Sequence, residues 1–184
     1  MAKPKHRSGR KAAGAARDRG AAAFWRFSLA LYGKPGVSQA AIRLQDRHGL
    51  DVNLLLLCCF VGAGGQGALT RAELAQADRA VRRWRQEVVQ PLRAVRRAWK
   101  LPPLAAGDTA DGTPRCRILQ AELCGEARAQ ALLAAWLATR QRAASGNAAA
   151  AVALSLERYA AAAARRLDRD DRAALELLAT MALA

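Results

Sequence analysis

Large apolar residues recur every three, four or seven positions along most of the chain, which is the spacing of one face of an α-helix. The clearest run begins at Thr70 and continues to about Lys100. In this run the repeat of seven is made by Leu74, Val81, Val88 and Val95. Thr70 and Glu73 have the spacing of a capping box, so they predict where this helix starts. Pro91 predicts a kink inside it.

Shorter helices are predicted before this run. Residues 21–32 carry aromatic and leucine side chains at helical spacing, and the Gly-Lys-Pro-Gly turn at residues 33–36 ends them. Residues 37–48 form a second helix, which Gly49 would end as a left-handed cap. Asp51 suits the N-cap of a third helix, residues 52–61. Because this third segment is apolar nearly all round, we expect it to be buried at the centre of the domain.

The second half of the chain also favours helices. Prolines and glycines predict a linker at about residues 101–114, followed by helices over residues 115–142 and 148–166. Asp168 or Asp170 would cap a last helix. No segment alternates as a strand does, so the predicted fold class is all-α, a compact helical bundle around a short buried central helix. We expect this helical domain at residues 21–142 and an Ala-rich helical extension at residues 143–184.

Composition adds a strong charge to this picture. The 184 residues contain 30 Lys and Arg against 15 Asp and Glu, a net charge of +15. Residues 1–20 hold seven basic side chains and one acid, and no large apolar residue except the first Met. Such a segment cannot bury enough surface to fold alone, so we expect a disordered basic arm. The charge favours partners that are polyanions, which include nucleic acid, the ribosome and acidic proteins.

The basic residues of the long helix fall on one stripe. With Leu74 taken as heptad position a, positions b, c and f hold Arg79, Arg82, Arg83, Arg93, Arg96, Arg97 and Lys100. Arginines spaced along one helix face can bind phosphates. The alternative is a solvated face in a chain rich in arginine, with the charges paired to acids elsewhere in the fold.

A second candidate site is the polar corner between the second and third predicted helices. It contains Gln45, Asp46, His48, Asp51 and Asn53. His48 with Asp46 or Asp51 would form an acid–base pair or a partial metal site, and this corner would be the best place for a small-molecule pocket. The simpler interpretation is that these side chains cap the two helix ends, whose free N–H and C=O groups need partners.

The glycine-rich loop at residues 62–67 is a third candidate. Gly64, Gly65 and Gln66 resemble the Gly-Gly-Gln tripeptide of peptide-chain release factors, in which the glutamine promotes hydrolysis of peptidyl-tRNA. The loop also fits the G-x-G-x-x-G pattern of dinucleotide sites. That pattern requires a strand before the loop and a parallel strand after the next helix, and neither is predicted here.

Other chemistry receives no support from the sequence. Cys58, Cys59, Cys116 and Cys124 form no C-x-x-C pair, and the two histidines are not spaced as ligands, so no metal site and no cofactor are predicted. Unpaired cysteines favour a reducing compartment, the cytoplasm. The longest apolar run, residues 54–61, is too short to cross a bilayer, so no membrane span is expected.

Three segments together are similar to a known family. Residues 24–37 (FWRFSLALYGKPGV), residues 44–56 (LQDRHGLDVNLLL) and residues 84–97 (WRQEVVQPLRAVRR) resemble a proteobacterial family known only as a domain of unknown function. The resemblance is strong over residues 24–100 and weak over residues 101–142. It implies a bacterial, cytoplasmic, helical protein, and it assigns no catalytic residue.

These patterns predict a non-catalytic binding or accessory protein. Its basic arm and basic helix face would contact RNA, the ribosome or an acidic protein. One alternative is a ribosome-linked peptidyl-tRNA hydrolase that acts through Gln66. Another is a structural oligomer or protein-interaction module that docks through its apolar helices.

Overall fold

A computed structural model describes residues 6–99, 113–140, 142, 144, 146–163 and 166–184. This described part is helical and contains no strand, which confirms the predicted all-α class. The elements are α1 (His6–Tyr32), α2 (Val37–His48), α3 (Val52–Ala63), α4 (Arg71–Trp84), the π-helical segment η1 (Arg85–Val89), α5 (Gln90–Ala98), α6 (Pro114–Leu137), α7 (Ala148–Ala163) and α8 (Arg169–Met181).

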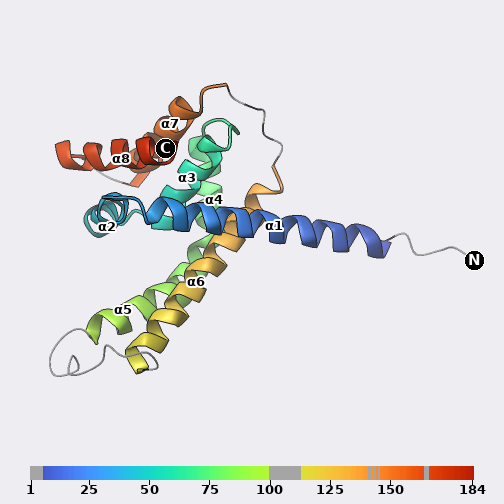
Figure 1. Ribbon diagram of the computed structural model, residues 1–184, viewed down its shortest axis with the longest axis horizontal. Coiled ribbons are helices and arrows are strands. Elements are labelled where there is room, and N and C mark those ends of the chain that lie inside the picture. Colours follow the sequence, from blue (N-terminus) through green and yellow to red (C-terminus); the bar gives the residue numbers. More distant parts are fainter. Residues whose placement is uncertain (1–5, 100–112, 141, 143, 145, 164–165) are drawn as a thin grey trace, which may run out of the picture.

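Helix α3 is the buried centre of the fold, as its uniformly apolar sequence predicts. Its leucines and cysteines between residues 54 and 59 are 0–5% exposed. It contacts α1, α2, α4, α6 and α7, and Figure 1 shows it between α7 and α1. Phe60 of α3 packs against two rings of α1, with its centroid 5.0 Å from Phe24 and 5.4 Å from Phe27.

The described part of the chain begins inside the expected basic arm. Helix α1 begins at His6, so residues 6–20 belong to this helix, while residues 1–5 lie outside the described part. Alanine and arginine have high helix propensity, and the aromatic end of α1 is anchored in the core, so the helix extends outward from a fixed end. In Figure 1 the N-terminal half of α1 extends away from the other helices.

The C-terminal helices pack into the core of the preceding helices. Helices α7 and α8 share one hydrophobic core with α3, so the boundary expected near residue 142 does not separate an extension from the domain. Val152 and Leu178 are completely buried in that core. At the contact between α3 and α7, a Cβ placed on Gly62 would lie 2.7 Å from the backbone nitrogen of Val152. Small residues therefore let the two helices pack closely.

Local signals predict the helix ends correctly. Gly49 ends α2 in the left-handed conformation, with φ of 69°. The Asp51 carboxylate caps α3 by accepting from the backbone N–H groups of Asn53 and Leu54. Thr70 and Glu73 form the capping box of α4, and Asp168 caps α8 in the same way. Each of these contacts lies within a few residues, which is why the sequence alone reveals them.

The long helix changes register near its middle. Pro91 has no N–H to donate to the preceding turn, and the five residues before Gln90 form the π-helical segment η1. A π-helical turn takes up one extra residue. Leu74 and Val81 are buried as the heptad spacing predicts, but the next buried position is Val89 and not Val88. Val95, which the same spacing places in the core, is 47% exposed.

Candidate functional site

The predicted polar corner is the start of a network that joins four elements. One carboxylate oxygen of Asp51, Oδ1, caps α3, and the other, Oδ2, accepts from Nη1 of Arg85 at 3.0 Å. Arg85 lies in η1, and its Nη2 is 2.9 Å from Oδ1 of Asp78. The backbone N–H of Asp51 donates to the Tyr159 hydroxyl of α7 at 2.8 Å. The cap predicted for Asp51 is therefore also a contact between helices.

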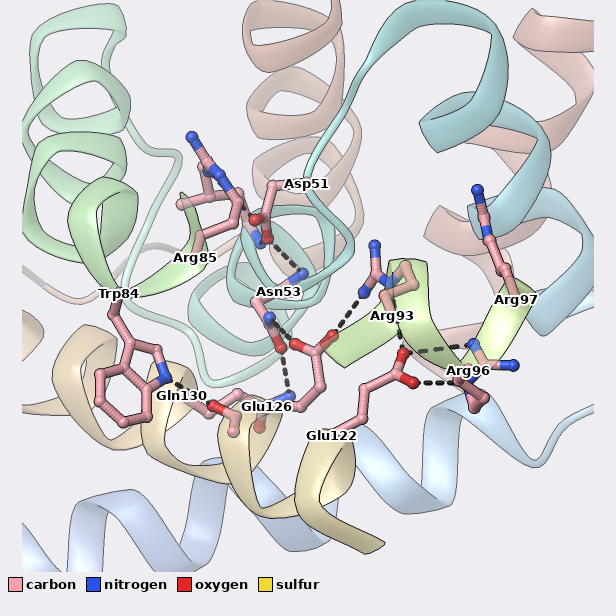
Figure 2. A network of polar contacts seen from close by, with 12 residues as sticks. Asp51, Asn53, Trp84, Arg85, Arg93, Arg96, Arg97, Glu122, Glu126 and Gln130 are labelled. Atoms are coloured by element: carbon pink, nitrogen blue, oxygen red, sulfur yellow. Dashed lines mark hydrogen bonds and ion pairs between the residues drawn. The ribbon is translucent and has the colours of Figure 1, made fainter. Parts of the chain in front are cut away.

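A row of hydrogen bonds continues from Asn53 towards α5 and α6. Asn53 donates from Nδ2 to Oε2 of Glu126 and accepts at Oδ1 from Nε2 of Gln130, 3.0 Å away. Glu126 also pairs with Arg93, whose Nε is 3.3 Å from Oε1 of Glu122. Figure 2 shows these side chains between α3, α5 and α6. The row ties the central helix to the projecting pair formed by α5 and α6.

Two further arginines of α5 complete the network. Arg96 binds Glu122 through Nε and Nη2. Arg97 donates from Nη2 to Oδ1 of Asp46 at 3.1 Å, and both of these side chains are about half exposed. Arg93 and Arg96 are only 20% and 21% exposed, and Glu122 is 8% exposed. The inner pairs are therefore shielded from water, whereas the outer pair is not.

The pKa values of Glu122 and Glu126 shift in opposite directions, because burial outweighs pairing at Glu126 and pairing outweighs burial at Glu122. Burial raises the pKa of Glu126 above its ordinary value, although Asn53 and Arg93 act against it. Burial would also raise the pKa of Glu122, but hydrogen bonds and charge from Arg96 and Arg93 outweigh it, and its pKa is lowered. Neither glutamate was predicted from the sequence. Their signal is present, because Glu122, Glu126 and Gln130 recur every four residues on an otherwise apolar face of α6.

Two hollows lie on either side of the Arg93 and Glu126 pair. The first has a volume of about 490 Å³ and is lined by four of the five predicted corner residues, Gln45, Asp46, Asp51 and Asn53. The second, of about 350 Å³, lies between α1, α2, α5 and α6, and we call it the α1/α6 groove. Its walls are mainly apolar, with Trp25, Leu29 and Leu123 among them.

His48 does not belong to this corner. Its Nε2 is 2.8 Å from Oδ2 of Asp171 in α8, so the hypothesis of an acid–base pair with Asp46 or Asp51 is wrong. Asp171 is completely buried and also meets Arg43 and Arg47 of α2. No sequence pattern could reveal this cluster, because Asp171 lies more than 120 residues from its partners.

The predicted basic stripe divides into two parts. Arg79 is exposed, and Arg82 and Arg83 are exposed side chains that pair with acids four residues away. Arg93 and Arg96 instead face α6, because the π-helical segment shifts the register. Lys100 lies outside the described residues. The first three arginines are thus accessible to a partner, whereas Arg93 and Arg96 are held inside the fold.

The glycine loop is a turn held in place by one side chain. Arg142 donates from Nε to the carbonyl oxygen of Gln66 at 2.9 Å and from Nη2 to that of Ala68 at 2.9 Å. It also pairs with Glu73 at the start of α4. The element before the loop is the helix α3 and not a strand. The nucleotide motif therefore lacks its structural context, and Gln66 is not at the tip of a free loop.

Two searches of the described part give negative findings. It contains no cluster of three or more His, Cys, Asp or Glu side chains placed to hold a metal ion. None of its helices is both long and apolar enough to cross a membrane.

The all-α fold, with its buried central helix and a polar network to a projecting helix pair, defines a small helical domain protein. Residues 23–133 match a family described as protein of unknown function (DUF2390). Because this match covers more than half of the chain, the protein belongs to that family. No curated protein and no solved structure matches it.

Proposed function

We propose that the protein is a non-catalytic, cytoplasmic binding protein that contacts RNA phosphates through its basic N-terminal segment. The observation that carries this proposal is the distribution of charge along the chain. Ten of the fifteen acidic residues form ion pairs among the described residues: Asp46, Asp51, Glu73, Asp78, Glu87, Glu122, Glu126, Asp168, Asp170 and Asp171. Residues 1–20 contain seven Lys and Arg and a single acid, Asp18.

The position of this segment supports the same proposal. The N-terminal half of α1 extends beyond the other helices, where a long polyanion can reach it (Figure 1). Phosphate contacts by Lys and Arg give affinity without base specificity, because condensed counterions are released. All four cysteines are free, which agrees with a reducing compartment.

The exposed arginines of α4 would add to this surface. Arg82 and Arg83 are 54% and 87% exposed. Ion pairs between such exposed side chains contribute at most about 0.5 kcal/mol to stability. RNA phosphates can therefore replace Asp78 and Glu87 as the partners of these arginines. Arg93 and Arg96 are excluded from the proposed surface because they are bound to buried glutamates.

The test is fluorescence anisotropy with a labelled single-stranded RNA over a series of salt concentrations. A variant with five substitutions by Gln keeps the chain length and should bind the RNA at least tenfold more weakly. The residues replaced are Lys3, Lys5, Arg7, Arg10 and Lys11. The magnitude of the slope of log K against log salt should fall by up to about 3.5, because each of the five phosphate contacts to a single strand contributes about 0.7. The Arg93→Gln variant is the matched control, and it should destabilise the fold while leaving the salt slope unchanged.

Two results would contradict the proposal. The first is an unchanged RNA affinity after the five substitutions. The second is binding to polyglutamate of equal charge that is as tight as binding to the RNA, which would point to an acidic protein partner instead.

A further inference from the structure

Helices α7 and α8 form a hairpin with an open groove between them, which we call the α7/α8 groove. It has a volume of about 870 Å³ and is lined by residues 149–161 of α7 and, from α8 and the residues just after it, by residues 172–183. Its floor is made by Leu156 and Leu175, which are 1% and 6% exposed. The two helices pack on α3 and α2 with their other faces. The groove therefore lies on the outer side of the hairpin and is uncovered.

The acids in this groove are unlike almost all the other acids of the protein, because they form no ion pair. Among the described residues, every Asp and Glu is in an ion pair except Asp18, Glu157 and Glu176. Glu157 and Glu176 both line the α7/α8 groove. So do Arg166 and Arg172, which also form no ion pair within the described part. All four of these side chains are exposed, so they are available to a partner.

The balance of these four charges selects the partner. A uniformly acidic partner would be repelled by Glu157 and Glu176, and a uniformly basic one by the two arginines. A second copy of the chain carries a net charge of +15, so most of its surface repels the first copy. The groove, with two acids and two arginines, is locally neutral. In a two-fold symmetric interface the same patch faces itself, so it must carry both signs of charge, and this patch does.

The size and shape of the hairpin fit a small interface of this kind. Helices α7 and α8 have 16 and 13 residues. At 1.5 Å per residue and about 10 Å per helix width, the face that they form measures roughly 20 Å by 20 Å. Weak and transient interfaces have about this size. The groove is lined largely by alanines, so the helices of another hairpin can approach closely.

We propose that the α7/α8 groove is the interface of a two-fold symmetric homodimer. The hairpins of the two copies pack face to face, and Glu157 and Glu176 of each copy pair with Arg166 and Arg172 of the other. Leu183, which lines the groove and is 44% exposed, becomes buried in the dimer. The small size of the face makes the dimer reversible, with a dissociation constant in the micromolar range.

This interface is separate from the proposed RNA surface. Figure 1 shows α7 and α8 on the other side of the molecule from the N-terminal half of α1. The dimer therefore leaves both basic segments accessible, and either proposal can fail without the other.

The experiment is sedimentation velocity of the full-length, nuclease-treated protein over a range of micromolar concentrations. The buffer contains about 0.15 M salt, where the Debye length of about 8 Å limits repulsion between remote charges. The wild type should pass from monomer to dimer as its concentration rises.

Two charge-reversed variants test the pairing. The acid-reversed variant carries Glu157→Arg and Glu176→Arg, and the base-reversed variant carries Arg166→Glu and Arg172→Glu. Each should dimerise at least about tenfold more weakly than the wild type, because like charges then face each other. An equimolar mixture, with one variant fluorescently labelled, should form a heterodimer, because every facing pair is again opposite in sign.

A matched control separates this pairing from the effect of net charge alone. Asp18→Arg reverses the remaining described acid that forms no ion pair, and this residue lies on α1, away from the groove. It should leave dimerisation unchanged. Circular dichroism should show the same helix content in all the variants, because the replaced side chains are exposed.

Several outcomes would overturn the proposal. A wild-type protein that stays monomeric throughout the concentration range has no such dimer. A dimer that the acid-reversed variant forms with wild-type affinity, or that Asp18→Arg weakens equally, does not use the α7/α8 groove. Two reversed variants that are monomeric alone and remain monomeric when mixed would show that Glu157 and Glu176 do not pair with the arginines of a second copy.

Discussion

Asp171 attaches the last helix to the second one, and replacing it by asparagine tests this attachment. Its completely buried carboxylate accepts from His48 Nε2 at 2.8 Å, from Arg43 Nε at 3.0 Å and from the backbone N–H of Asp168 at 3.0 Å. An asparagine side chain at this position would keep the shape and one acceptor, so the capping contact can survive. It would lose the charge that holds His48 and the two arginines of α2.

The expected loss in the free energy of unfolding follows from how exposed each partner of Asp171 is. His48 is 11% exposed, so its bond to the carboxylate contributes about 2 kcal/mol, as a shielded charge-assisted hydrogen bond does. Arg43 is 34% exposed, and solvent screening limits its contribution to about 0.5 kcal/mol. We therefore expect Asp171→Asn to lower the free energy of unfolding by about 2–3 kcal/mol.

The effect should depend on pH with a definite sign. Burial alone would raise the pKa of Asp171, but the bonds from His48, the capping N–H and Arg43 outweigh it, and its pKa lies well below the ordinary value. A carboxylate with a lowered pKa stabilises the fold above its unfolded-state pKa of about 4, and this stabilisation is lost as pH falls. The difference between wild type and variant should therefore shrink below about pH 4.

Urea unfolding followed by circular dichroism at pH 7 and pH 3 measures both quantities. Asp170→Asn is the control, because this neighbouring side chain is 72% exposed and meets Arg43 at only 3.4 Å. It should change the free energy of unfolding by less than about 0.5 kcal/mol. The reasoning is refuted if Asp171→Asn costs no more than Asp170→Asn, or if its effect is the same at the two pH values.

Three further predictions concern packing, pairing and thiol chemistry. Gly62→Ala should destabilise the fold by about 2 kcal/mol in the same assay, because the new methyl meets the α7 backbone, whereas Gly20→Ala, with nothing within 4 Å, should be neutral or stabilising. Glu122→Gln should cost about 2–3 kcal/mol by leaving two shielded arginines short of a partner, while Glu87→Gln, which affects an exposed pair, should cost less than about 0.5 kcal/mol. In a thiol-reagent titration at pH 8, exposed Cys124 should react at once. Burial raises the pKa of Cys59 to about 12, so it and Cys58 should react only after unfolding.

Local patterns in the chain were enough to locate the helices and most of their ends. Apolar spacing located α2, α3 and α4, and the uniformly apolar segment at residues 54–61 identified the buried centre. Gly49, Asp51, Thr70 and Asp168 marked helix ends correctly. These features depend on contacts within one or two turns, so the nearby sequence carries all the information that they need. The family resemblance, too, rested on local strings and is confirmed.

Packing between the helices settled which charges are available and which are paired. A heptad count places Arg93 and Arg96 on the outer face, but the π-helical segment takes up one residue and turns the following positions by about 100°. These arginines then meet Glu122 and Glu126 on α6. In the same way His48 meets Asp171, and the Ala-rich end joins the central core. Contacts between helices depend on register and crossing, which no local pattern encodes, so the polar network and the α1/α6 groove became visible only in three dimensions.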